Sequence, residues 1–471
     1  MKKRIVAILL ALTMLLSMGM LAGCNNGGSV QGNFEVPEGG YDGSAVTIYF
    51  DHTMGTNLSD VLNLYIAEFN KLYPNITIVH EQVGNYDDVR DNIAVELTVG
   101  NQPDIAYCYP DHVALYNISK RVITLDSLID STVEITRADG SKEILGLTQA
   151  QKDDFIAGYY NEGKQFGDGL MYTLPLSKST EVLYYNKTFF DANNLTVPTT
   201  WDEMEAVCQK IKAIDPNSIP LGYDSEANWF ITMCEQQKSP YTSATGEHFL
   251  FDNEANRNFV AKFRDWYKKG YLTTQEILGS YTSELFKSDD GTRSYMSIGS
   301  SAGATHQRPT KGEDGTYPFE VGIATIPQAD ANNPKVISQG PSLCLFQSEN
   351  PQETIAAWLF MKFLTTNVEF QAEFSMASGY VPVLKSVAQN DVYAEFLSKA
   401  DGGDYISALS AKRCLEQEKA YYTSPAFVGS SDARDAVGLL LQSCLVESGT
   451  DVNAILDKAF KDAITSCKEG F

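Results

Sequence analysis

Basic residues are scarce in this chain. It has 36 lysine and arginine residues against 60 aspartate and glutamate residues, and its formal net charge is −24 at pH 7. Proteins that bind nucleic acid use a positively charged surface to neutralise phosphates, so this composition argues against such a partner. It also argues against docking on anionic lipid through charge alone. The acidic residues are spread along the whole sequence, which favours solubility as their common role.

Histidine and the motifs of metal and nucleotide enzymes are also lacking. The five histidines are scattered, and neither an HExxH motif nor a His/Cys pair at zinc spacing occurs. The sequence contains no phosphate-binding loop of the GxxxxGK[ST] type, and no GxGxxG follows a predicted strand. We therefore expect neither a metal ion nor an organic cofactor.

One hydrolase-like motif is present. Residues 299–303 read GSSAG, which matches GxSxG, and they follow a predicted strand. A hydrolase of that fold needs its histidine later in the chain than the serine, with the acid between them. The only histidine after Ser301 is His306, which leaves no room for the acid, so we interpret this motif as non-catalytic. A carboxylate pair for glycoside cleavage stays open, because acidic residues are numerous.

Cysteine is infrequent and follows no motif. The chain has eight cysteines and no CxxC pair, and several lie in apolar segments, as Cys234 and Cys344 do. Such positions are typical of small core residues. The sequence leaves one or two disulfides open, because spacing alone does not fix cysteine pairing.

The N-terminal segment carries the most specific local pattern. Lys2, Lys3 and Arg4 precede an apolar run, which ends in Leu21–Cys24, read LAGC. A basic start, a short apolar segment and small residues before a cleavage site are typical of a secretory signal. The LAGC stretch resembles the lipobox of bacterial lipoproteins. This resemblance implies cleavage after residue 23, lipid attachment at Cys24 and anchoring to the outer side of the cell membrane.

The segment after Cys24 and the first half of the chain differ in pattern. Residues 24–44 are rich in glycine and asparagine and lack apolar periodicity, so we predict a flexible tether. From Val46 onward, apolar periodicity predicts alternating strands and helices. The predicted strands span 46–50, 76–79 and 104–108, and the predicted helices span 58–72 and 86–99. This βαβαβ spacing is typical of a parallel sheet covered by helices.

A second α/β region begins near residue 178. A capping box at 200–203 predicts the start of a helix. Predicted strands span 182–185, 296–298, 321–324 and 336–346, the last interrupted by Gly340 and Pro341, and helices are expected at 356–364, 368–374 and from 432 onward. A chain of this length is expected to fold as at least two domains.

The strongest family resemblance lies at 174–187, LPLSKSTEVLYYNK, followed by PTTWDE at 198–203. This pattern resembles the family 1 extracellular solute-binding proteins of bacterial ABC importers, and 322–327 and 378–383 support it. The resemblance implies an α/β, two-lobed periplasmic-binding-protein-like (type II) fold. It also implies a ligand cleft between the lobes, and no catalysis.

The resemblance also implies a division of the chain and a set of partners. The division is a signal peptide at 1–23, a tether at 24–44, lobe 1 at 45–177 plus 337–378, and lobe 2 at 178–336 plus 379–471. Crossing segments are expected near 177, 337 and 378. The implied partners are a small solute (a sugar, polyol or phosphate ester), the subunits of an ABC permease, and the membrane through the lipid anchor. We expect a monomer located outside the cytoplasm.

Several stretches resemble the glycerol-3-phosphate and glycerophosphodiester binders of this family. They are 84–86, 299–301, 339–342 and 378–380. The resemblance implies that the phosphate is held by Ser179, Ser300 or Ser301, Gly340, Tyr380 and Arg434, with Tyr86 at the glycerol end. Where those binders have an acidic residue after the third strand, this chain reads Tyr109-Pro110-Asp111, and Asp111 is a candidate substitute.

Physical reasoning adds candidates at the strand ends. Parallel sheets bind ligands beyond the carboxyl ends of their strands, where Asp51, Tyr86, Tyr109 and Asp111 are expected. Carboxylates accept hydrogen bonds from hydroxyl groups, and aromatic rings cover C–H surfaces. Trp229 is a candidate for stacking on a sugar ring. Each position also has a structural alternative, as a cap, a turn, a core residue or an ion pair.

Three functions remain after these arguments. The first choice is a lipid-anchored binding protein that delivers a sugar or oligosaccharide to an ABC importer. The second is a binding protein of the same family for glycerol 3-phosphate or a glycerophosphodiester. The third, from a different class, is a surface enzyme that acts on glycans.

Overall fold

The computed structural model describes residues 34–288, 291–402 and 405–470. The predicted signal peptide, the lipidation site Cys24 and the tether up to residue 33 lie outside these residues. Residues from Phe34 onward form one compact unit. None of the helices within the described ranges combines the length and the apolar character needed to cross a membrane.

Residues 34–44 do not form the tether that the sequence predicted. Phe34 is buried, and its carbonyl accepts a hydrogen bond of 2.7 Å from Ser127 Oγ. Gln352 Nε2 donates to the carbonyl of Gly40 at 3.1 Å, and its Oε1 accepts from the backbone N–H of Asp42 at 2.9 Å. The predicted tether was therefore too long, because aromatic burial and these hydrogen bonds fix this segment although it lacks periodicity.

Lobe 1 is built on a five-stranded sheet of order β2-β1-β3-β13-β6. The first three are parallel, and β13 runs antiparallel to both β3 and β6. Its strands are β1 (Val46–His52), β2 (Ile76–Gln82), β3 (Ile105–Cys108), β6 (Leu174–Pro175) and β13 (Ser342–Leu345). Its main helices are α2 (Thr56–Leu72), α3 (Tyr86–Val99), α4 (Pro110–Tyr116), α14 (Pro351–Thr366) and α15 (Val368–Ser378). The predicted βαβαβ unit is confirmed.

Local sequence explains why α3 begins and ends where it does. The side chain of Asn85 accepts hydrogen bonds from the backbone N–H groups of Asp87 and Asp88, and Asp88 completes a capping box. The helix ends at Gly100, as predicted. Val89, Ile93 and Leu97 recur at helical spacing and are buried. This arrangement brings Tyr86, the first residue of the helix, to the carboxyl edge of the sheet.

Lobe 2 has a second five-stranded sheet, of order β11-β7-β10-β8-β9. Strands β8, β9 and β10 are parallel, and β7 runs antiparallel to β10 and β11. Its strands are β7 (Glu181–Asn186), β8 (Leu221–Tyr223), β9 (Leu272–Thr274), β10 (Met296–Ser300) and β11 (Val321–Thr325). Its main helices are α9 (Trp201–Ile214), α10 (Glu226–Gln237), α11 (Glu254–Lys268), α18 (Ser430–Val446) and α19 (Val452–Gly470). The capping box predicted at 200–203 is confirmed.

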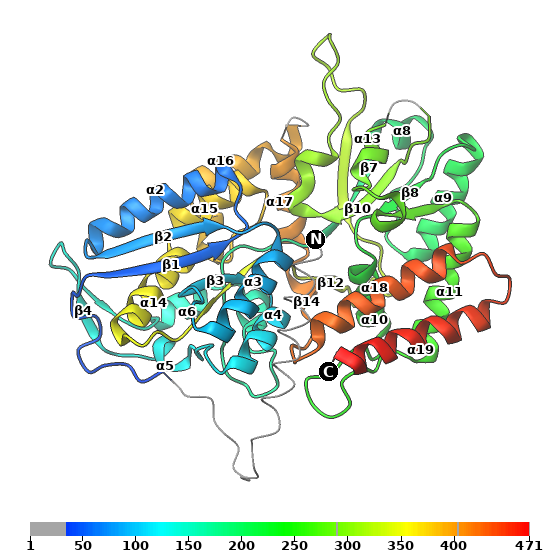
Figure 1. Ribbon diagram of the computed structural model, residues 1–471. Coiled ribbons are helices and arrows are strands. Elements are labelled where there is room, and N and C mark those ends of the chain that lie inside the picture. Colours follow the sequence, from blue (N-terminus) through cyan, green and yellow to red (C-terminus); the bar gives the residue numbers. More distant parts are fainter. Residues whose placement is uncertain (1–33, 289–290, 403–404, 471) are drawn as a thin grey trace, which may run out of the picture. The chain divides into compact units, whose positions relative to one another are not determined.

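The remaining helices and strands are short or lie near the lobe junction. They are α5 (Asp126–Ile129), β4 (Glu134–Thr136), β5 (Lys142–Ile144), α6 (Gln149–Asp154), α7 (Ala157–Glu162), α8 (Lys187–Ala192), α12 (Gln275–Leu278), α13 (Ser283–Lys287), α16 (Asp391–Ser398) and α17 (Ile406–Glu416). In Figure 1 the two sheets lie in opposite halves of the described unit, each with its own helices.

Three segments meet where the lobes join. Lys178 pairs with Val381, and Ser179 pairs with Gln339, in isolated antiparallel bridges. Strands β12 (Val336–Ile337) and β14 (Tyr421–Tyr422) form a parallel pair that Figure 1 places between the two lobes. The segments predicted to cross near 177, 337 and 378 therefore lie side by side, while the exact lobe bounds stay a prediction.

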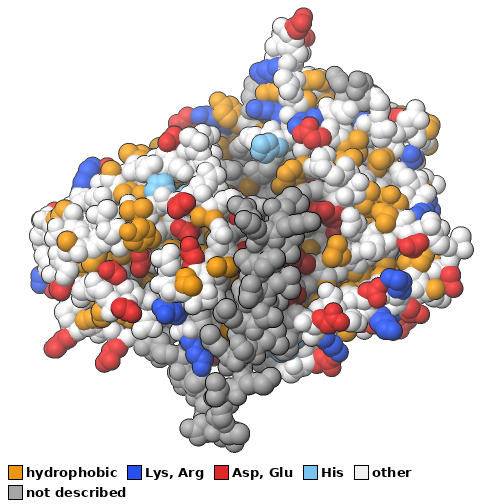
Figure 2. All heavy atoms as spheres, viewed as in Figure 1, with side chains coloured by type: hydrophobic (Ala, Val, Ile, Leu, Met, Phe, Trp, Pro, Cys, Tyr) orange, Lys and Arg blue, Asp and Glu red, His pale blue; other side chains and the backbone are white. Residues whose placement is uncertain are grey.

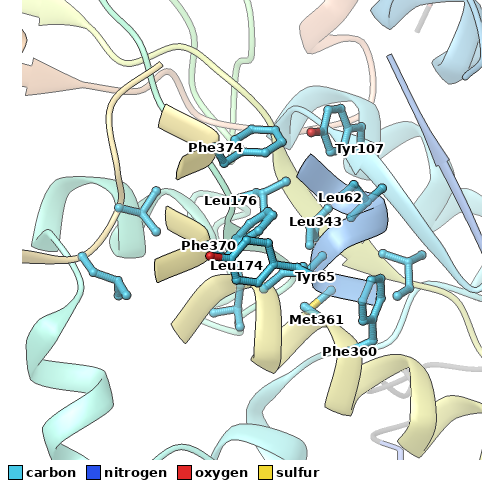
Figure 3. Close-up of a cluster of buried hydrophobic side chains, with 14 of the residues drawn as sticks. Leu62, Tyr65, Tyr107, Leu174, Leu176, Leu343, Phe360, Met361, Phe370 and Phe374 are labelled. Carbon is cyan, nitrogen blue, oxygen red and sulfur yellow. The ribbon is translucent and has the colours of Figure 1, made fainter. Parts of the chain in front are cut away.

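The hydrophobic core has two parts, one centred on lobe 1 that also includes Val182, Tyr184 and Ile323 of the lobe 2 sheet, and one within lobe 2. In Figure 3, side chains from α2, α14 and α15 pack with side chains of β3, β6 and β13. The core of lobe 2 contains Trp201, Trp229 and Trp266, which are at most 4% exposed. The cysteines within the described ranges are buried and unbonded, as expected of core residues. On the face shown in Figure 2, acidic and basic side chains are interspersed, which agrees with a solvating role for the charge.

Candidate functional site

A pocket of about 250 Å³ lies between the two lobes, at the carboxyl edge of the lobe 1 sheet. Lobe 1 contributes α3 and the loop from β3 into α4, and lobe 2 contributes α10 and α18. The crossing segment at 337–339 forms part of the wall. Four of the residues predicted for ligand binding line this pocket, namely Tyr86, Tyr109, Asp111 and Arg434.

Tyrosines form one wall of the pocket. The rings of Tyr86 and Tyr109 lie 4.8 Å apart between centroids, and Tyr86 also stacks on Tyr107 at 6.4 Å. The hydroxyl of Tyr86 lies 3.3 Å from that of Tyr380, which comes from the segment after α15. Burial raises the pKa of Tyr86 and of Tyr109 well above the usual phenol value, so both keep neutral hydroxyl groups that donate or accept hydrogen bonds.

Arg434 is held in place by a buried network in lobe 2. Its guanidinium donates to Asn228 Oδ1, and Asn228 Nδ2 donates to Glu181 Oε1 at 3.1 Å. Tyr223 donates its hydroxyl proton to the other oxygen of Glu181. Burial raises the pKa of Glu181 to about 7, against the effect of these hydrogen bonds and of Arg434. The network therefore joins the pocket to the strands β7 and β8.

Asp111 makes a contact across the cleft. Ser431 of α18 donates its hydroxyl proton to Asp111 Oδ2 at 2.8 Å. Burial by itself would raise the pKa of Asp111, but the neighbouring His112 and Arg434 and this hydrogen bond lower the pKa below its usual value. The carboxylate of Asp111 is therefore ionised at neutral pH and links the first turn of α4 to the first turn of α18.

The predicted serine and glycine residues lie at the crossing segments, beside the pocket wall. Ser300 Oγ donates to Ser179 Oγ at 3.4 Å, and the backbone N–H of Ser179 donates to the carbonyl of Gln339, which lines the pocket. Gly340 has a φ of +93°, and a Cβ there would lie 2.5 Å from the carbonyl oxygen of Ser177. Only glycine allows these two segments to approach so closely.

The chain matches the family model described as "bacterial extracellular solute-binding protein" over residues 65–397. The chain belongs to that family. Among curated relatives, it is 24% identical over 377 residues to the sn-glycerol-3-phosphate-binding periplasmic protein UgpB of Shigella flexneri, which covers 77% of this chain and 80% of the relative. It is 23% identical to UgpB of Salmonella typhimurium, with the same coverage.

Solved structures agree with the fold of this solute-binding protein. The cyclic alpha-maltosyl-1,6-maltose binding protein of Arthrobacter globiformis superposes with a TM-score of 0.69 at 18% identity, and the match covers 90% of this chain and 100% of that one. UgpB from Mycobacterium tuberculosis, in complex with glycerophosphocholine, gives 0.68 at 16% identity, with 90% and 99% covered. The two-lobed periplasmic-binding-protein fold is thereby confirmed.

Membership in the family establishes the role of the chain in outline. Extracellular solute-binding proteins work outside the cytoplasm, bind small-molecule solutes and serve ABC importers. The predicted class of function is therefore confirmed for this solute-binding protein. The predicted lipid anchor, the monomeric state and the individual ligand contacts stay predictions.

Besides Ser179, Ser300, Gly340 and Tyr380, three further predicted contacts of this solute-binding protein lie outside the pocket lining, namely Trp229, Ser301 and Asp51. Trp229 is fully buried, stacks on Tyr223 at 4.7 Å and belongs to the lobe 2 core, so its predicted role in sugar stacking is corrected. Its place on α10 explains this outcome, because the helix turns its apolar side inward. Ser301 is also fully buried, and its hydroxyl accepts from the backbone N–H of Thr180 at 3.2 Å.

Asp51 is the third of these residues. It lies within β1, one residue before the buried His52 that ends the strand, and it does not belong to the lining of the pocket. Burial raises its pKa to about 6, and the carboxylates of Glu96 and Glu81 add to this effect. Asp51 therefore lies on the α3 side of the sheet among other acids, because successive side chains of a strand alternate between its faces.

A buried ion pair at the edge of the pocket could not be predicted from the sequence. Lys178 Nζ donates to Glu162 Oε1 at 2.6 Å, to the carbonyl of Gly340 at 3.0 Å and to Ser342 Oγ at 3.0 Å. The exposed fractions of the Lys178 and Glu162 side chains are 0% and 2%, and Glu162 lines the pocket. A lysine and a glutamate 16 residues apart follow no motif, so only the fold identifies this pair.

Proposed function

We propose that this solute-binding protein captures a carbohydrate or a similar hydroxyl-rich solute in the pocket between its lobes. The observation that carries the proposal is the composition of the lining, in which the tyrosines 86, 109 and 241 stand beside the carboxylates of Asp111 and Glu162. Aromatic faces cover the C–H surface of a sugar, and carboxylates accept hydrogen bonds from its hydroxyls. Solved structures with this fold include the maltose-bound MalE3 of T. maritima and the sugar-binding protein MalE of Xanthomonas citri, which supports this ligand class.

The proposal includes the path of the solute. The protein is attached to the outer side of the membrane by a lipid on Cys24, binds the solute, and presents it to the permease without changing it chemically. Capture and release of the solute involve rotation of the lobes about the crossing segments near 178, 339 and 381, and binding stabilises the closed arrangement. We expect the protein to work as a monomer.

A second candidate ligand is glycerol 3-phosphate or a glycerophosphodiester. Arg434 and Ser431, at the amino end of α18, favour this candidate because a guanidinium and a helix N-terminus together attract anions. The curated relatives named sn-glycerol-3-phosphate-binding proteins give it further support.

Thermal-shift screening of the mature protein tests the proposal. Sugars, polyols and phosphodiesters are added in parallel, and a solute that binds the folded state raises the melting temperature. Stabilisation by sugars or polyols supports the first candidate, and stabilisation by phosphate esters alone supports the second. Recovery of the solute unchanged after incubation supports a binding protein, whereas release of reducing ends from glycans would show an enzyme.

A further inference from the structure

The amino end of α18 brings positive groups to the pocket, and Asp432 adds one acidic side chain to its first turn. The helix follows Gly429, which has no side chain with which to cap it. The first N–H groups of a helix have no partner within the helix, and they carry part of the positive end of its dipole. Arg434, one turn into α18, adds a full positive charge on the pocket side. A negatively charged group is therefore favoured at this point.

A side chain of lobe 1 already supplies that negative charge. The carboxylate of Asp111 accepts the 2.8 Å hydrogen bond from Ser431, which lies in the first turn of α18. Asp111 itself is set by the short α4, which begins at Pro110 directly after β3. The contact joins the two lobes, because α4 packs with α3 of lobe 1 whereas α18 packs with α10, α11 and α19 of lobe 2, and α4 and α18 pack against each other here.

The other charges of the pocket are mostly negative as well. Its lining includes Asp87, Glu162 and Asp435 in addition to Asp111, against the guanidinium groups of Arg90 and Arg434 and, at the edge of the pocket, the ammonium group of Lys178, which pairs with Glu162. Arg90 is paired with Asp87 at 3.1 Å and with Asp91 at 2.8 Å. An anionic solute that entered would meet Asp111 next to Arg434, and would face like charges on the opposite wall.

We propose that Asp111 is an interlobe latch and the residue that selects against anionic ligands. It occupies, at the amino end of α18, the position that a phosphate group would need. This inference rests on the proposed function, since it takes the same pocket as the ligand site. The selected ligand is an uncharged, hydroxyl-rich solute, and a phosphate monoester is excluded as long as Asp111 keeps its charge.

Small-angle X-ray scattering of the protein without solute tests the latch. Asp111→Ala and Asp111→Asn should give a larger radius of gyration than the parent, because both remove the charge that holds α4 to α18. Asp87→Asn is the matched control, since it removes an acidic charge from the same lining that pairs with Arg90 of its own helix and not with Ser431. Equal radii of gyration for the parent and the Asp111 variants would overturn the latch. This measurement needs no solute and does not depend on the proposed function.

Titration calorimetry with inorganic phosphate and with glycerol 3-phosphate tests the selection. Asp111→Asn should bind either anion at least about tenfold more tightly than the parent, because a like charge is removed from the site. Asp87→Asn should gain much less, and adding Arg434→Ala to Asp111→Asn should abolish the gain. An equal gain in both single variants, or none in Asp111→Asn, would overturn the selection. A failure of every sugar and polyol to bind the parent would instead count against the proposed function.

Discussion

The two walls of the pocket are built in different ways. The lobe 1 wall comes mainly from short segments that directly follow strands, with Tyr86 after β2 and Tyr109 and Asp111 after β3. The lobe 2 wall comes from α18, far along the chain, and its Arg434 is held by Asn228 and Glu181 from other elements. The first wall is therefore fixed by local structure, and the second depends on long-range contacts between buried polar groups.

This difference decides where each wall is vulnerable. A change in the lobe 1 wall should alter the contact with the ligand and leave the fold intact, because strand ends and helix caps position its side chains. A change in the support of the lobe 2 wall should alter stability and its pH dependence, because the supporting groups are buried and charged. One group of the lobe 1 wall departs from this rule, since Glu162 is held by Lys178 from a crossing segment.

The largest effect is expected from Lys178→Met. The change leaves the carboxylate of Glu162 buried without its cation, and breaking a buried pair in this way costs about 3–5 kcal/mol in the free energy of unfolding. Urea denaturation measures this loss. The double variant Lys178→Met with Glu162→Leu should recover most of it, because no charge is then left buried.

A surface ion pair provides the control for this variant. Lys262 pairs with Asp202 at 2.6 Å, where the Asp202 side chain is 90% exposed. Lys262→Met should therefore cost less than about 1 kcal/mol. If Lys178→Met lowered the free energy of unfolding as little as Lys262→Met, the stability of the crossing segments would not depend on the buried pair.

Glu181 should make the stability of the protein depend on pH. Its pKa is about 7 in the folded protein against an ordinary 4.5, so the folded state holds the proton more tightly than the unfolded state. Its contribution therefore falls as pH rises from 4.5 to about 7, by roughly 3 kcal/mol in total. Urea denaturation across this pH range measures the fall.

The variant Glu181→Gln isolates this contribution. Above pH 7, Glu181→Gln should be more stable than the parent. Between pH 4.5 and about 7, its free energy of unfolding should fall by roughly 3 kcal/mol less than that of the parent. Glu68→Gln, on the exposed surface of α2, removes a carboxylate outside this buried network and is the control variant measured in parallel. Parallel profiles for the parent and Glu181→Gln would show that Glu181 titrates alike in both states.

Arg434→Ala compares the two candidate ligands at the lobe 2 wall. A phosphate ester should lose about 2–5 kcal/mol of binding free energy, roughly 30-fold or more in affinity, because its charged partner is gone. An uncharged sugar that bonds to the guanidinium should lose at most about 1.5–3 kcal/mol. Titration calorimetry at low and high salt distinguishes the phosphate ester from the sugar, since only the ionic interaction of the phosphate ester weakens with salt. We expect the smaller, salt-independent loss, because Asp111 places a negative charge near Arg434.

The sequence could predict the elements and much of the lobe 1 wall. Regular apolar spacing located β1 to β3 and their helices, and the rule that ligands bind at carboxyl ends pointed to Tyr86, Tyr109 and Asp111. It failed for Trp229, because a tryptophan early in a helix has the same local pattern whether that turn faces a cleft or a core. The rule about carboxyl ends also failed for Asp51, because it predicts the edge of the sheet at which a residue lies but not the face on which its side chain lies.

The lobe 2 wall could be found only by family resemblance. No spacing rule connects Arg434 with Asn228 and Glu181, because these contacts depend on how α18 packs against α10 and β7. The pair of Lys178 and Glu162 was missed for the same reason. Buried polar networks join residues that are distant in sequence, and a single sequence holds no record of such pairs.

The smallest effect is expected from Tyr380→Phe, where the two walls meet the crossing segment. The Tyr380 hydroxyl lies 3.3 Å from that of Tyr86, and its removal takes away one neutral hydrogen-bonding group from the ligand side. The affinity for the solute found by screening should fall by about 1 kcal/mol, whether the solute is a sugar or a phosphate ester. Tyr49→Phe, at a position that is 54% exposed in lobe 1, is the control and should bind like the parent. If Tyr380→Phe lost tenfold more affinity for the solute than Tyr49→Phe, Tyr380 would also hold Tyr86 in place. The lobe 1 wall would then depend on a long-range contact as well.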